Sequence, residues 1–298
     1  MADRKRIAEL IALGLIRLSE DRYEPLIRID RVEDVLVASD LRRRRRAPDY
    51  VVGPGPASFL LARHVRPPGR GRVLDLGSGS GIQALLLARH GVDILGLDVN
   101  PRALAMARFN AGINGRRIAF EHGDFLAAEP DRTLDGRFET VVANPPFVLA
   151  PSARLVYRDR PLPGDQVSRR TIERVARVLA EGGRGYVLCN WIDRGGRWSD
   201  PVRAWVDPGF DAVVVLLGTH APADYAAIWN RDLPPADKPG VIADWIRALA
   251  AEGIGRIHVG LVALGRPPVQ MGRRRRFEAV DRADRAIDGE TIEGFLAG

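Results

Sequence analysis

Glycines alternate with serines in the stretch DLGSGSG of residues 75–81, directly after an apolar run that reads as a short buried strand. Glycine allows a positive φ and lets a ligand approach the backbone closely, so this spacing predicts a ligand-binding turn. The helix predicted to begin at Ile82 would offer its first unpaired N–H groups to a negative group. The pattern is GxGxG after an acid, whereas a dinucleotide pyrophosphate site is typically GxGxxG. The candidate binding residues are Asp75, Gly77, Gly79 and Gly81.

Three later stretches also place polar side chains beside short apolar runs. Leu95–Asn100 reads as a second strand that ends in the acid Asp98. Glu121–Phe125 carries Asp124, and Val141–Phe147 is a buried strand that runs into the letters NPPF. In a sheet of parallel strands, ligands bind outside the carboxyl ends of the strands, so these ends are candidate parts of one site.

With the glycine turn, these stretches resemble in type and order the motifs of class I methyltransferases that use S-adenosylmethionine (SAM). The resemblance covers residues 48–270. Within that class the chain resembles the small-domain and release-factor glutamine N-methyltransferase-like enzymes, which carry an N-terminal module before a SAM domain with an NPP motif. It departs from the release-factor enzymes in having NPPF where NPPY is usual, and in a short N-terminal region. The resemblance implies a SAM-dependent N-methyltransferase.

The resemblance also implies how the cofactor SAM is held. Asp98 would accept hydrogen bonds from both ribose hydroxyls, as acids do in dinucleotide sites. Asp124 would accept one from the adenine amino group, while Phe125 and Val99 would enclose the ring. Asp75 would face the cationic amino-acid end of SAM through the glycine turn.

Asn144-Pro145-Pro146-Phe147 resembles the motif of enzymes that methylate a nitrogen conjugated to a planar group, such as a base amine or a glutamine amide. The lone pair of such a nitrogen is delocalised, which makes it a poor nucleophile. The implied role of the Asn144 oxygen, which would also border the cofactor, and of the Pro145 carbonyl is to accept its two N–H bonds and favour a pyramidal nitrogen. Pro145 and Pro146 fix the turn, and Phe147 offers a stacking face. No metal or covalent nucleophile is required.

The loop after this motif, residues 148–165, is expected to bind the methyl acceptor, because loops at the carboxyl ends of strands carry function. The alternative is that its polar residues serve packing. The candidates are Tyr157, Arg158, Asp159, Arg160 and Asp165 in the loop, with Asn190 and Trp191 beside it.

Strand and helix patterns alternate through residues 48–270, which predicts a doubly wound, seven-stranded, mostly parallel α/β sheet of Rossmann-like type. The last two predicted strands, Phe210–Leu217 and Ile257–Leu264, look like the reversed hairpin that closes a class I methyltransferase sheet. The resemblance further implies that Tyr50–Ser58 folds over the methionine end of the cofactor.

The first 47 residues predict a small module of a helix and a β-hairpin. The helix covers Ala2–Ile16, and the strands Tyr23–Ile29 and Val32–Ser39 meet at Asp30-Arg31. Such a module suits either a winged-helix type of recognition unit or a cap on the main domain, and we favour the cap. Residues 271–298 read as a charged tail with little packing.

Composition narrows the class of protein. No apolar run approaches the ~20 residues of a membrane helix, and no signal-peptide pattern is present. Cys189 is the only cysteine, which argues against a disulfide framework or a cysteine-rich zinc site, so we expect a cytoplasmic protein without a membrane or metal partner. The net charge is +7, and almost all of the positively charged side chains are arginines, with clusters at Arg42–Arg46 and Arg273–Arg276. Each cluster is either a solvated segment or a surface for an anionic partner such as RNA.

Three functions remain open from the sequence. The first is methylation of a macromolecule, at a protein glutamine or an RNA base. The second is methylation of a small molecule of secondary metabolism. The third is a SAM-binding regulator without catalysis, against which the intact NPPF motif argues, because cofactor binding alone does not require it.

Overall fold

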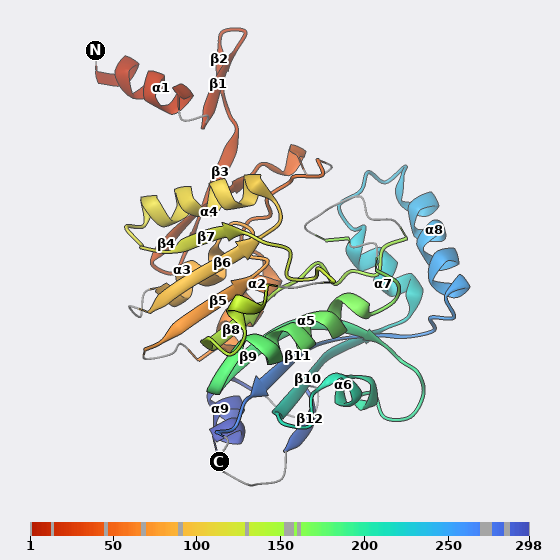
Figure 1. The fold of residues 1–298 in the computed structure, drawn as a ribbon. Coiled ribbons are helices and arrows are strands. Elements are labelled where there is room, and N and C mark those ends of the chain that lie inside the picture. Colours follow the sequence, from red (N-terminus) through yellow and green to blue (C-terminus); the bar gives the residue numbers. More distant parts are fainter. Residues whose placement is uncertain are drawn as a thin grey trace.

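A computed structural model describes residues 2–12, 15–44, 47–66, 70–88, 92–128, 131–151, 158–159, 162–268, 276–282 and 287–297. Within this part, eight strands form one sheet in the order β12-β10-β11-β9-β8-β5-β6-β7, which runs through the body of the molecule in Figure 1. The strands are β5 (Arg72–Leu76), β6 (Asp93–Asp98), β7 (Ala119–His122), β8 (Phe138–Ala143), β9 (Leu179–Ile192), β10 (Asp211–His220), β11 (Ile257–Gly265) and β12 (Phe277–Asp281).

Successive side chains of each central strand pack on opposite faces of this sheet. Val73 and Val213 lie in one hydrophobic core. Their neighbours Leu74 and Val214 lie in the other, so both faces of the sheet are buried. Side chains from α2 (Pro56–His64), α3 (Ile82–Ala88), α4 (Pro101–Ile113), α7 (Pro222–Trp229), α8 (Lys238–Ala251) and α9 (Gly289–Ala297) complete the first core. The second core is completed by α5 (Gln166–Val178) and α6 (Asp200–Trp205).

Most strand pairs in the sheet are parallel, which confirms the predicted doubly wound α/β fold. Strand β5 pairs in parallel with β6 and β8, and antiparallel pairing occurs where β11 meets β9 and β10. The predicted reversed hairpin is therefore β10–β11. The sheet has one strand more than the seven expected, because β12 adds to the edge of β10 in parallel register.

The prediction of a poorly packed tail is wrong for the described residues beyond 271. Strand β12 pairs with β10, and its Val280 is buried. Helix α9 buries Ile292 and Leu296 in the first core, while His64 of α2 bonds through Nε2 to the backbone oxygen of Ile287. The charged composition of this segment masked a short strand and a helix with one apolar face.

The N-terminal region contains two hairpins, where one was expected. Helix α1 (Ala2–Ala12) is followed by β1 (Ile16–Ser19) and β2 (Arg22–Pro25), and then by β3 (Ile27–Val32) and β4 (Val35–Asp40). Pro25 has no N–H to donate, which limits continuation of the predicted strand Tyr23–Ile29. The second turn lies at Glu33-Asp34, beyond the predicted Asp30-Arg31, and Glu33 takes the left-handed φ of 51° there.

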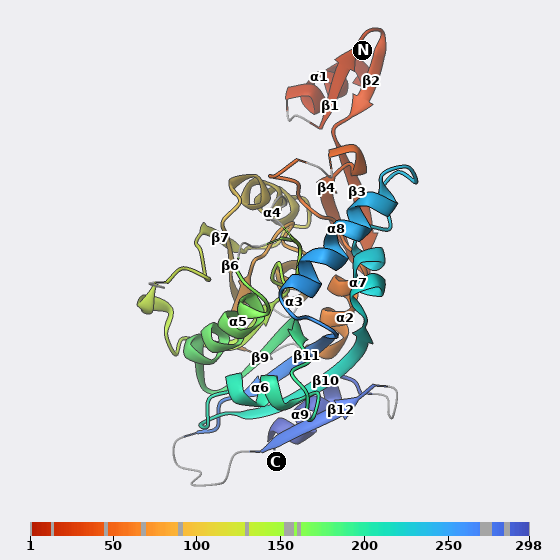
Figure 2. The ribbon, with the colours of Figure 1, turned by 90° about the vertical axis from the view of Figure 1, so that its right-hand side faces the viewer.

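The two N-terminal hairpins differ in their surroundings. Helix α1 and the β1–β2 hairpin project from the body in two perpendicular views (Figures 1 and 2). The β3–β4 hairpin packs on the main domain, since Val35 and Val37 share a core with Leu85 of α3. Asn110 of α4 also exchanges hydrogen bonds with the backbone of Ala38. The β3–β4 hairpin thus packs on the main domain as a cap, whereas helix α1, which was predicted as part of the same cap, projects from the body.

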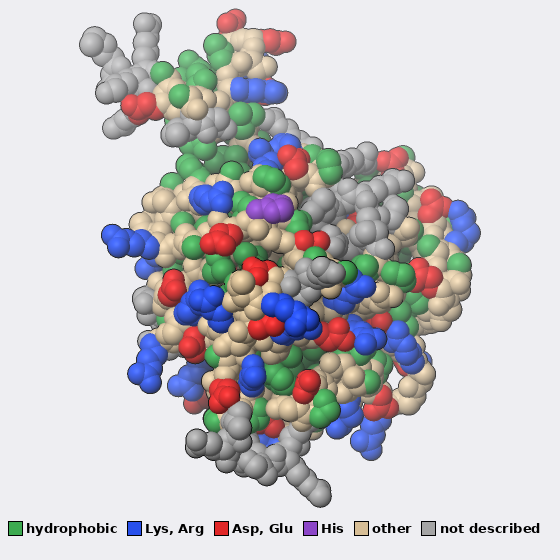
Figure 3. Space-filling view, viewed as in Figure 1, with side chains coloured by type: hydrophobic (Ala, Val, Ile, Leu, Met, Phe, Trp, Pro, Cys, Tyr) green, Lys and Arg blue, Asp and Glu red, His purple; other side chains and the backbone are tan. Residues whose placement is uncertain are grey.

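Charged side chains of both signs are interspersed over the face shown in Figure 3. Of the two arginine clusters, Arg44 pairs with Asp40 and Asp49, and Arg276 pairs with Asp211. Arg45, Arg46 and Arg273–Arg275 lie outside the described residues. In the described part of the chain, no helix has both the length and the apolar character needed to cross a membrane.

Candidate active site

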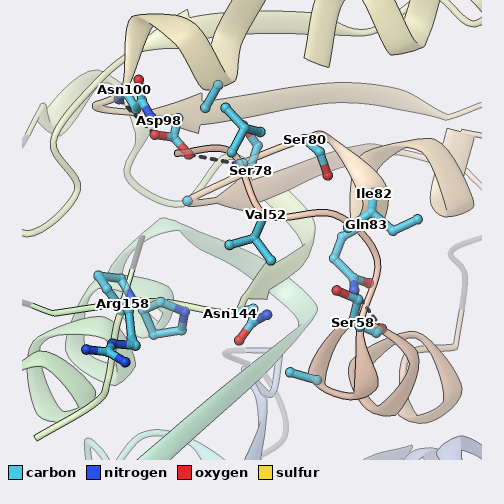
Figure 4. A pocket seen from close by; sticks show the side chains of 18 of the residues that line it. Val52, Ser58, Ser78, Ser80, Ile82, Gln83, Asp98, Asn100, Asn144 and Arg158 are labelled. Carbon is cyan, nitrogen blue, oxygen red and sulfur yellow. Dashed lines mark hydrogen bonds between the residues drawn. The ribbon is translucent and has the colours of Figure 1, made fainter. Parts of the chain in front are cut away.

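A cavity of about 320 Å³ opens at the carboxyl ends of β5, β6 and β8. Figure 4 shows side chains that line it, including Asp98, Ser78, Val52 and Asn144. This edge of the sheet is where the strand order turns from β5–β6 to β5–β8, so the loops that follow neighbouring strands diverge there. Such a point is the usual ligand site of an open α/β sheet.

The glycine turn after β5 has the conformation that its sequence predicts. Gly77, Gly79 and Gly81 take φ values of 71°, 55° and 80°. The N–H groups of Gly77 and Ser78 donate to the Leu97 carbonyl at 2.8 and 2.9 Å, which fixes the turn on β6. A Cβ on Gly79 would meet no atom within 4 Å, so this part of the backbone is open to a ligand.

Gly81 has a different part in the turn from the other predicted glycines. It does not line the cavity. A Cβ there would lie 3.1 Å from Phe120 and 3.2 Å from Ala107, so Gly81 permits close packing of the turn on the core. Its positive φ and this packing explain the glycine without a direct ligand contact.

Asp98 faces the cavity with both carboxylate oxygens already bonded to backbone. Its Oδ2 accepts from the Gly79 N–H and its Oδ1 from the Asn100 N–H, each at 2.8 Å. Burial raises the pKa of Asp98, and these hydrogen bonds oppose that rise. Since an ionised carboxylate has about four lone-pair sites, Asp98 can still accept from ligand hydroxyls while the two N–H groups fix its orientation.

Asp75 is the most deeply buried acid of the cavity. It is 2% exposed and accepts a hydrogen bond from the Ala84 N–H at 3.2 Å. Burial raises its pKa to about 7, and the negative charge of Asp98 adds to the rise. Two acids whose charged forms are disfavoured in the free pocket suit a ligand that carries positive charge.

Two buried hydroxyls at the turn lack a partner within the described residues. Ser78 and Ser80 line the cavity with 4% and 2% exposure, and neither Oγ has a hydrogen bond there. Buried polar atoms are normally bonded, so these hydroxyls are consistent with a polar ligand in the cavity. Beside them, Gln83 donates from Nε2 to the Ser58 carbonyl at 2.8 Å and fixes the start of α2.

The predicted adenine end is formed by residues after β6 and β7. Val99, Asp124 and Phe125 all line the cavity. Phe125 is 8% exposed, and its ring lies 3.5 Å from the position of a Cβ on Gly77, so it borders the glycine turn. Asp124 is exposed and accepts from the Leu126 N–H at 2.9 Å. These positions give an apolar face beside an acceptor, which suits a flat heterocycle with an amino group.

The NPPF motif borders the other end of the cavity, directly after β8. The Asn144 side chain lies in the cavity and makes no hydrogen bond to the described part of the chain (Figure 4). The Pro145 carbonyl accepts from the Phe147 N–H at 2.8 Å and keeps a second lone pair. Asn144, Pro145, Pro146 and Phe147 all line the cavity.

Helix α7 supplies a wall beside the motif that local sequence does not reveal. Trp229 and Arg231 line the cavity, and the rings of Trp229 and Phe147 meet edge to face with centroids 6.1 Å apart. Their positions depend on a helix inserted between β10 and β11, some eighty residues beyond NPPF. An aromatic residue near a helix end carries no signal of this in the sequence.

A buried tyrosine joins this wall to the NPPF segment. The Tyr225 hydroxyl accepts from the Leu149 N–H at 3.1 Å and from Asn190 Nδ2 at 2.6 Å. Burial raises the pKa of Tyr225, which therefore stays neutral. Next to it, Arg158 donates to the Trp229 carbonyl at 3.0 Å and pairs with Asp159 at 2.6 Å, so its guanidinium holds α7 against the loop.

The predicted acceptor-binding loop, residues 148–165, contributes two described residues to the cavity, Val148 and Arg158. Asp165 instead accepts from the Ile192 N–H and pairs with Arg194. Asn190 and Trp191 are fully buried and do not line the cavity, so they position other groups. Tyr157 and Arg160 lie outside the described residues.

Parts of this chain are similar in sequence to known methyltransferases. Residues 54–191 match the family model of the methyltransferase small domain. A ribosomal protein L11 methyltransferase of Thermus thermophilus is 40% identical over 104 residues, 35% of this chain and 39% of that protein. A ribosomal RNA small subunit methyltransferase C of Alcanivorax borkumensis is 29% identical over 175 residues, 58% and 47% of the two chains. A release factor glutamine methyltransferase of Rhodospirillum rubrum is 45% identical over 87 residues, 28% and 25% of the two chains. The chain thus matches less than half the length of each of these relatives.

Proposed function

Since residues 54–191 carry a methyltransferase small domain, we propose that the chain is a SAM-dependent N-methyltransferase that acts on a planar nitrogen of a protein glutamine or an RNA base. The observation that carries the proposal is one cavity with two acids at one end and, at the other, the Asn144 amide, which has no hydrogen bond to the described part of the chain. The acids suit the hydroxyls and cationic groups of SAM, and the amide oxygen suits an N–H group of the molecule that receives the methyl group.

The chain's own residues fit this cofactor in three places. Asp98, held by two backbone N–H groups, would accept from the ribose hydroxyls. Asp75 would face the ammonium group, and the Ser78 and Ser80 hydroxyls would bond polar atoms of the amino-acid end of SAM. Phe125 and Val99 would border the adenine. Bound SAM supplies an electrophilic methyl carbon on a sulfonium.

Asn144 orients the nitrogen that receives the methyl group. Its Oδ1 accepts one N–H and the Pro145 carbonyl accepts the second, which turns the nitrogen lone pair away from conjugation and toward the methyl. Both contacts strengthen as positive charge develops on the nitrogen. They therefore stabilise the transition state more than the ground state in which the methyl acceptor is bound. The aromatic corner of Phe147 and Trp229 offers an apolar surface for the planar group.

The class of acceptor is supported by the names of the relatives. Their titles assign methylation of ribosomal protein L11, of small-subunit ribosomal RNA and of release-factor glutamine. We extend to this chain what these names share, a protein or an RNA as the methyl acceptor, and we infer the nitrogen from the NPPF motif. The aromatic corner and the NPPF motif serve a base amine and a side-chain amide equally well.

Transfer of tritium from methyl-labelled SAM tests the proposal. The full chain is incubated with SAM and, separately, with total RNA, total protein and a metabolite fraction, with Asp98→Ala as the matched control. Label in RNA or protein that depends on Asp98 supports the proposal. Label only in the metabolite fraction identifies a small-molecule enzyme. SAM binding without any transfer identifies a regulator.

A further inference from the structure

A buried acid outside the cavity organises one of its walls. Asp40, the last residue of β4, has a fully buried side chain. Arg102 of α4 donates to its two oxygens at 2.5 and 3.2 Å, and Arg44 lies 3.3 Å from Oδ1. These arginines hold the pKa of Asp40 below its usual value although burial opposes this, so the carboxylate is charged.

The same carboxylate holds the segment that borders the cavity from the N-terminal side, residues 50–58, which we call the strap. Asp40 Oδ2 accepts from the Val51 N–H at 2.9 Å, and the Asp40 N–H donates to the Val51 carbonyl at 3.1 Å. Both backbone polar groups of Val51 are thus bonded to Asp40. Asn100 adds a hydrogen bond from Nδ2 to the Asp49 carbonyl at 3.0 Å.

The strap packs against the β3–β4 hairpin on one side and borders the cavity on the other. A Cβ on Gly53 would lie 2.4 Å from the Ser39 Oγ, so the strap passes over β4 with no room for a side chain. On its other side the strap lines the cavity at Val52, Gly55, Pro56 and Ser58, among other residues. Figure 4 shows Val52 reaching into the space between Ser78 and Asn144.

The pair of Asp40 and Arg102 is better suited to fixing a position than to adding stability. Taking two charges out of water costs nearly as much as their attraction returns, so an apolar pair of the same size would serve stability equally well. A charged pair with directed hydrogen bonds admits fewer arrangements of the groups attached to it. The group attached to the carboxylate here is Val51 of the strap. Beside it, the Asn100 side chain accepts from the backbone N–H of Arg102, and the backbone N–H of Asn100 donates to Asp98.

We propose that Asp40 and Arg102 are positioning residues of the SAM site, and that the β3–β4 hairpin acts through them to hold the strap against the cofactor. This inference rests on the proposed function, because it assigns the strap to the same cofactor. If loss of the pair leaves the strap in place for only about a tenth of the time, the apparent dissociation constant rises about tenfold.

Titration calorimetry with S-adenosylhomocysteine (SAH) as the probe tests the inference on the full chain. The variants are Asp40→Asn, Arg102→Met and the double variant, which leaves no unpaired buried charge. The control is Arg116→Met, which breaks the 3.0 Å pair between Arg116 and Asp34 at the far end of the same hairpin. Each titration is run well below the melting temperature of that variant, so that all molecules are folded.

We expect the dissociation constant for SAH to rise about tenfold in Arg102→Met and in Asp40→Asn, and to stay within twofold in Arg116→Met. The double variant should lose no more affinity than either single variant, because both act through one pair. A purely structural role would lower the melting temperature and leave the affinity of folded protein unchanged.

Three results overturn the inference. They are wild-type affinity in folded Arg102→Met and double variants, an equal loss in Arg116→Met, and additive losses in the double variant. Should Asp40→Asn not fold, the Arg102→Met and double variants decide between these outcomes. Failure of the wild-type chain to bind both SAM and SAH is a different result, and it contradicts the proposed function instead.

Discussion

At the scale of residues, the two ends of the cavity differ in how their polar atoms are bonded. Both oxygens of Asp98 accept backbone N–H groups, which fixes the carboxylate before a ligand arrives. The Asn144 amide, by contrast, has no hydrogen bond in the described part of the chain and is held by the rigid turn of two prolines. The first arrangement suits binding of a cofactor, and the second suits an acceptor that changes charge during the reaction.

Replacing Asn144 separates these two tasks. We expect Asn144→Ala to lower the turnover rate by about 10²–10³, because one preorganised acceptor is lost at the reacting nitrogen. SAM affinity should stay within a few fold, since Asp98 and the glycine turn are untouched. Asn144→Asp should be less damaging, because it keeps an oxygen and adds a negative charge. Single-turnover methyl transfer at saturating SAM measures this, and a wild-type rate in Asn144→Ala would show that the motif does not hold the nitrogen.

The raised pKa of Asp75 predicts how cofactor affinity depends on pH. With a pKa of about 7, the carboxyl is mostly neutral at pH 6 and mostly charged at pH 8. Because the charged form attracts the ammonium group, we expect SAH affinity to rise about tenfold between these pH values, as one site gives. Calorimetry at both values measures it. Asp98 and His122 also face this region, so Asp75→Asn is the control, and a pH dependence that persists in it contradicts the assignment.

For the unliganded protein the same pKa shift acts on stability. The folded state binds the Asp75 proton more tightly than the unfolded chain, whose carboxyl titrates near pH ~4. The contribution to stability is therefore present at low pH and is lost as the pH rises through about 7. Asp75 is therefore expected to bind the ammonium group best at the pH values at which it contributes least to the stability of the fold. Such a trade-off between function and stability is common at functional sites.

At the scale of elements, α7 shapes the acceptor end of the cavity although it belongs to a distant part of the chain. It brings Trp229 to Phe147, and its Tyr225 hydroxyl bonds the backbone just after the NPPF motif. We therefore propose that the insertion between β10 and β11 shapes the end of the cavity that binds the methyl acceptor, while the loops after β5, β6 and β7 border the proposed cofactor end.

Removing the Tyr225 hydroxyl tests this role of α7. We expect Tyr225→Phe to lower the free energy of unfolding by about 1–3 kcal/mol, because the Leu149 N–H and Asn190 Nδ2 lose their buried acceptor. SAH affinity should stay within twofold, since no cofactor residue is involved. Urea unfolding and calorimetry measure the two quantities. Tyr23→Phe is the control, because Tyr23 is 52% exposed, and an equal effect there would contradict the prediction.

At the scale of the whole molecule, a segment near each end of the chain packs on the central domain. The β3–β4 hairpin closes over α3 and α4 near the N-terminus, and α9 covers β10 and β11 near the C-terminus (Figure 1). Only α1 and the β1–β2 hairpin stand clear of the described body. The proposed cofactor end of the cavity is lined by residues between Tyr50 and Leu126.

The packing of α9 is tested by truncating one side chain. Leu296 is 2% exposed, and we expect Leu296→Ala to lower the free energy of unfolding by about 2–5 kcal/mol through lost burial and a cavity. Leu18→Ala is the matched control, since Leu18 is 60% exposed on β1. Urea unfolding of both variants measures the difference, and similar midpoints for the two would show that α9 does not pack as described.

The sequence alone predicted the central fold, which the structure confirms, and the polar residues that lie together at its strand ends. Short apolar runs alternate with helices there, which predicts a mostly parallel sheet with helices on both faces. The turn after β5 needs glycine because three of its residues take a positive φ. Asp75, Asp98, Asp124 and Asn144 each sit directly at a strand end, where parallel pairing brings them together without further information.

Only the tertiary structure decided which distant residues complete the cavity. Trp229 and Arg231 come from an insertion, and Asp40 acts through backbone contacts with the strap, so no spacing in the sequence connects them to the site. The eighth strand and α9 were likewise hidden by a charged composition. Strand β12 pairs with the edge of β10, and the apolar residues of α9 are buried in the first core. The sequence does not show these surfaces, because burial depends on which residues lie opposite a side chain in the folded protein.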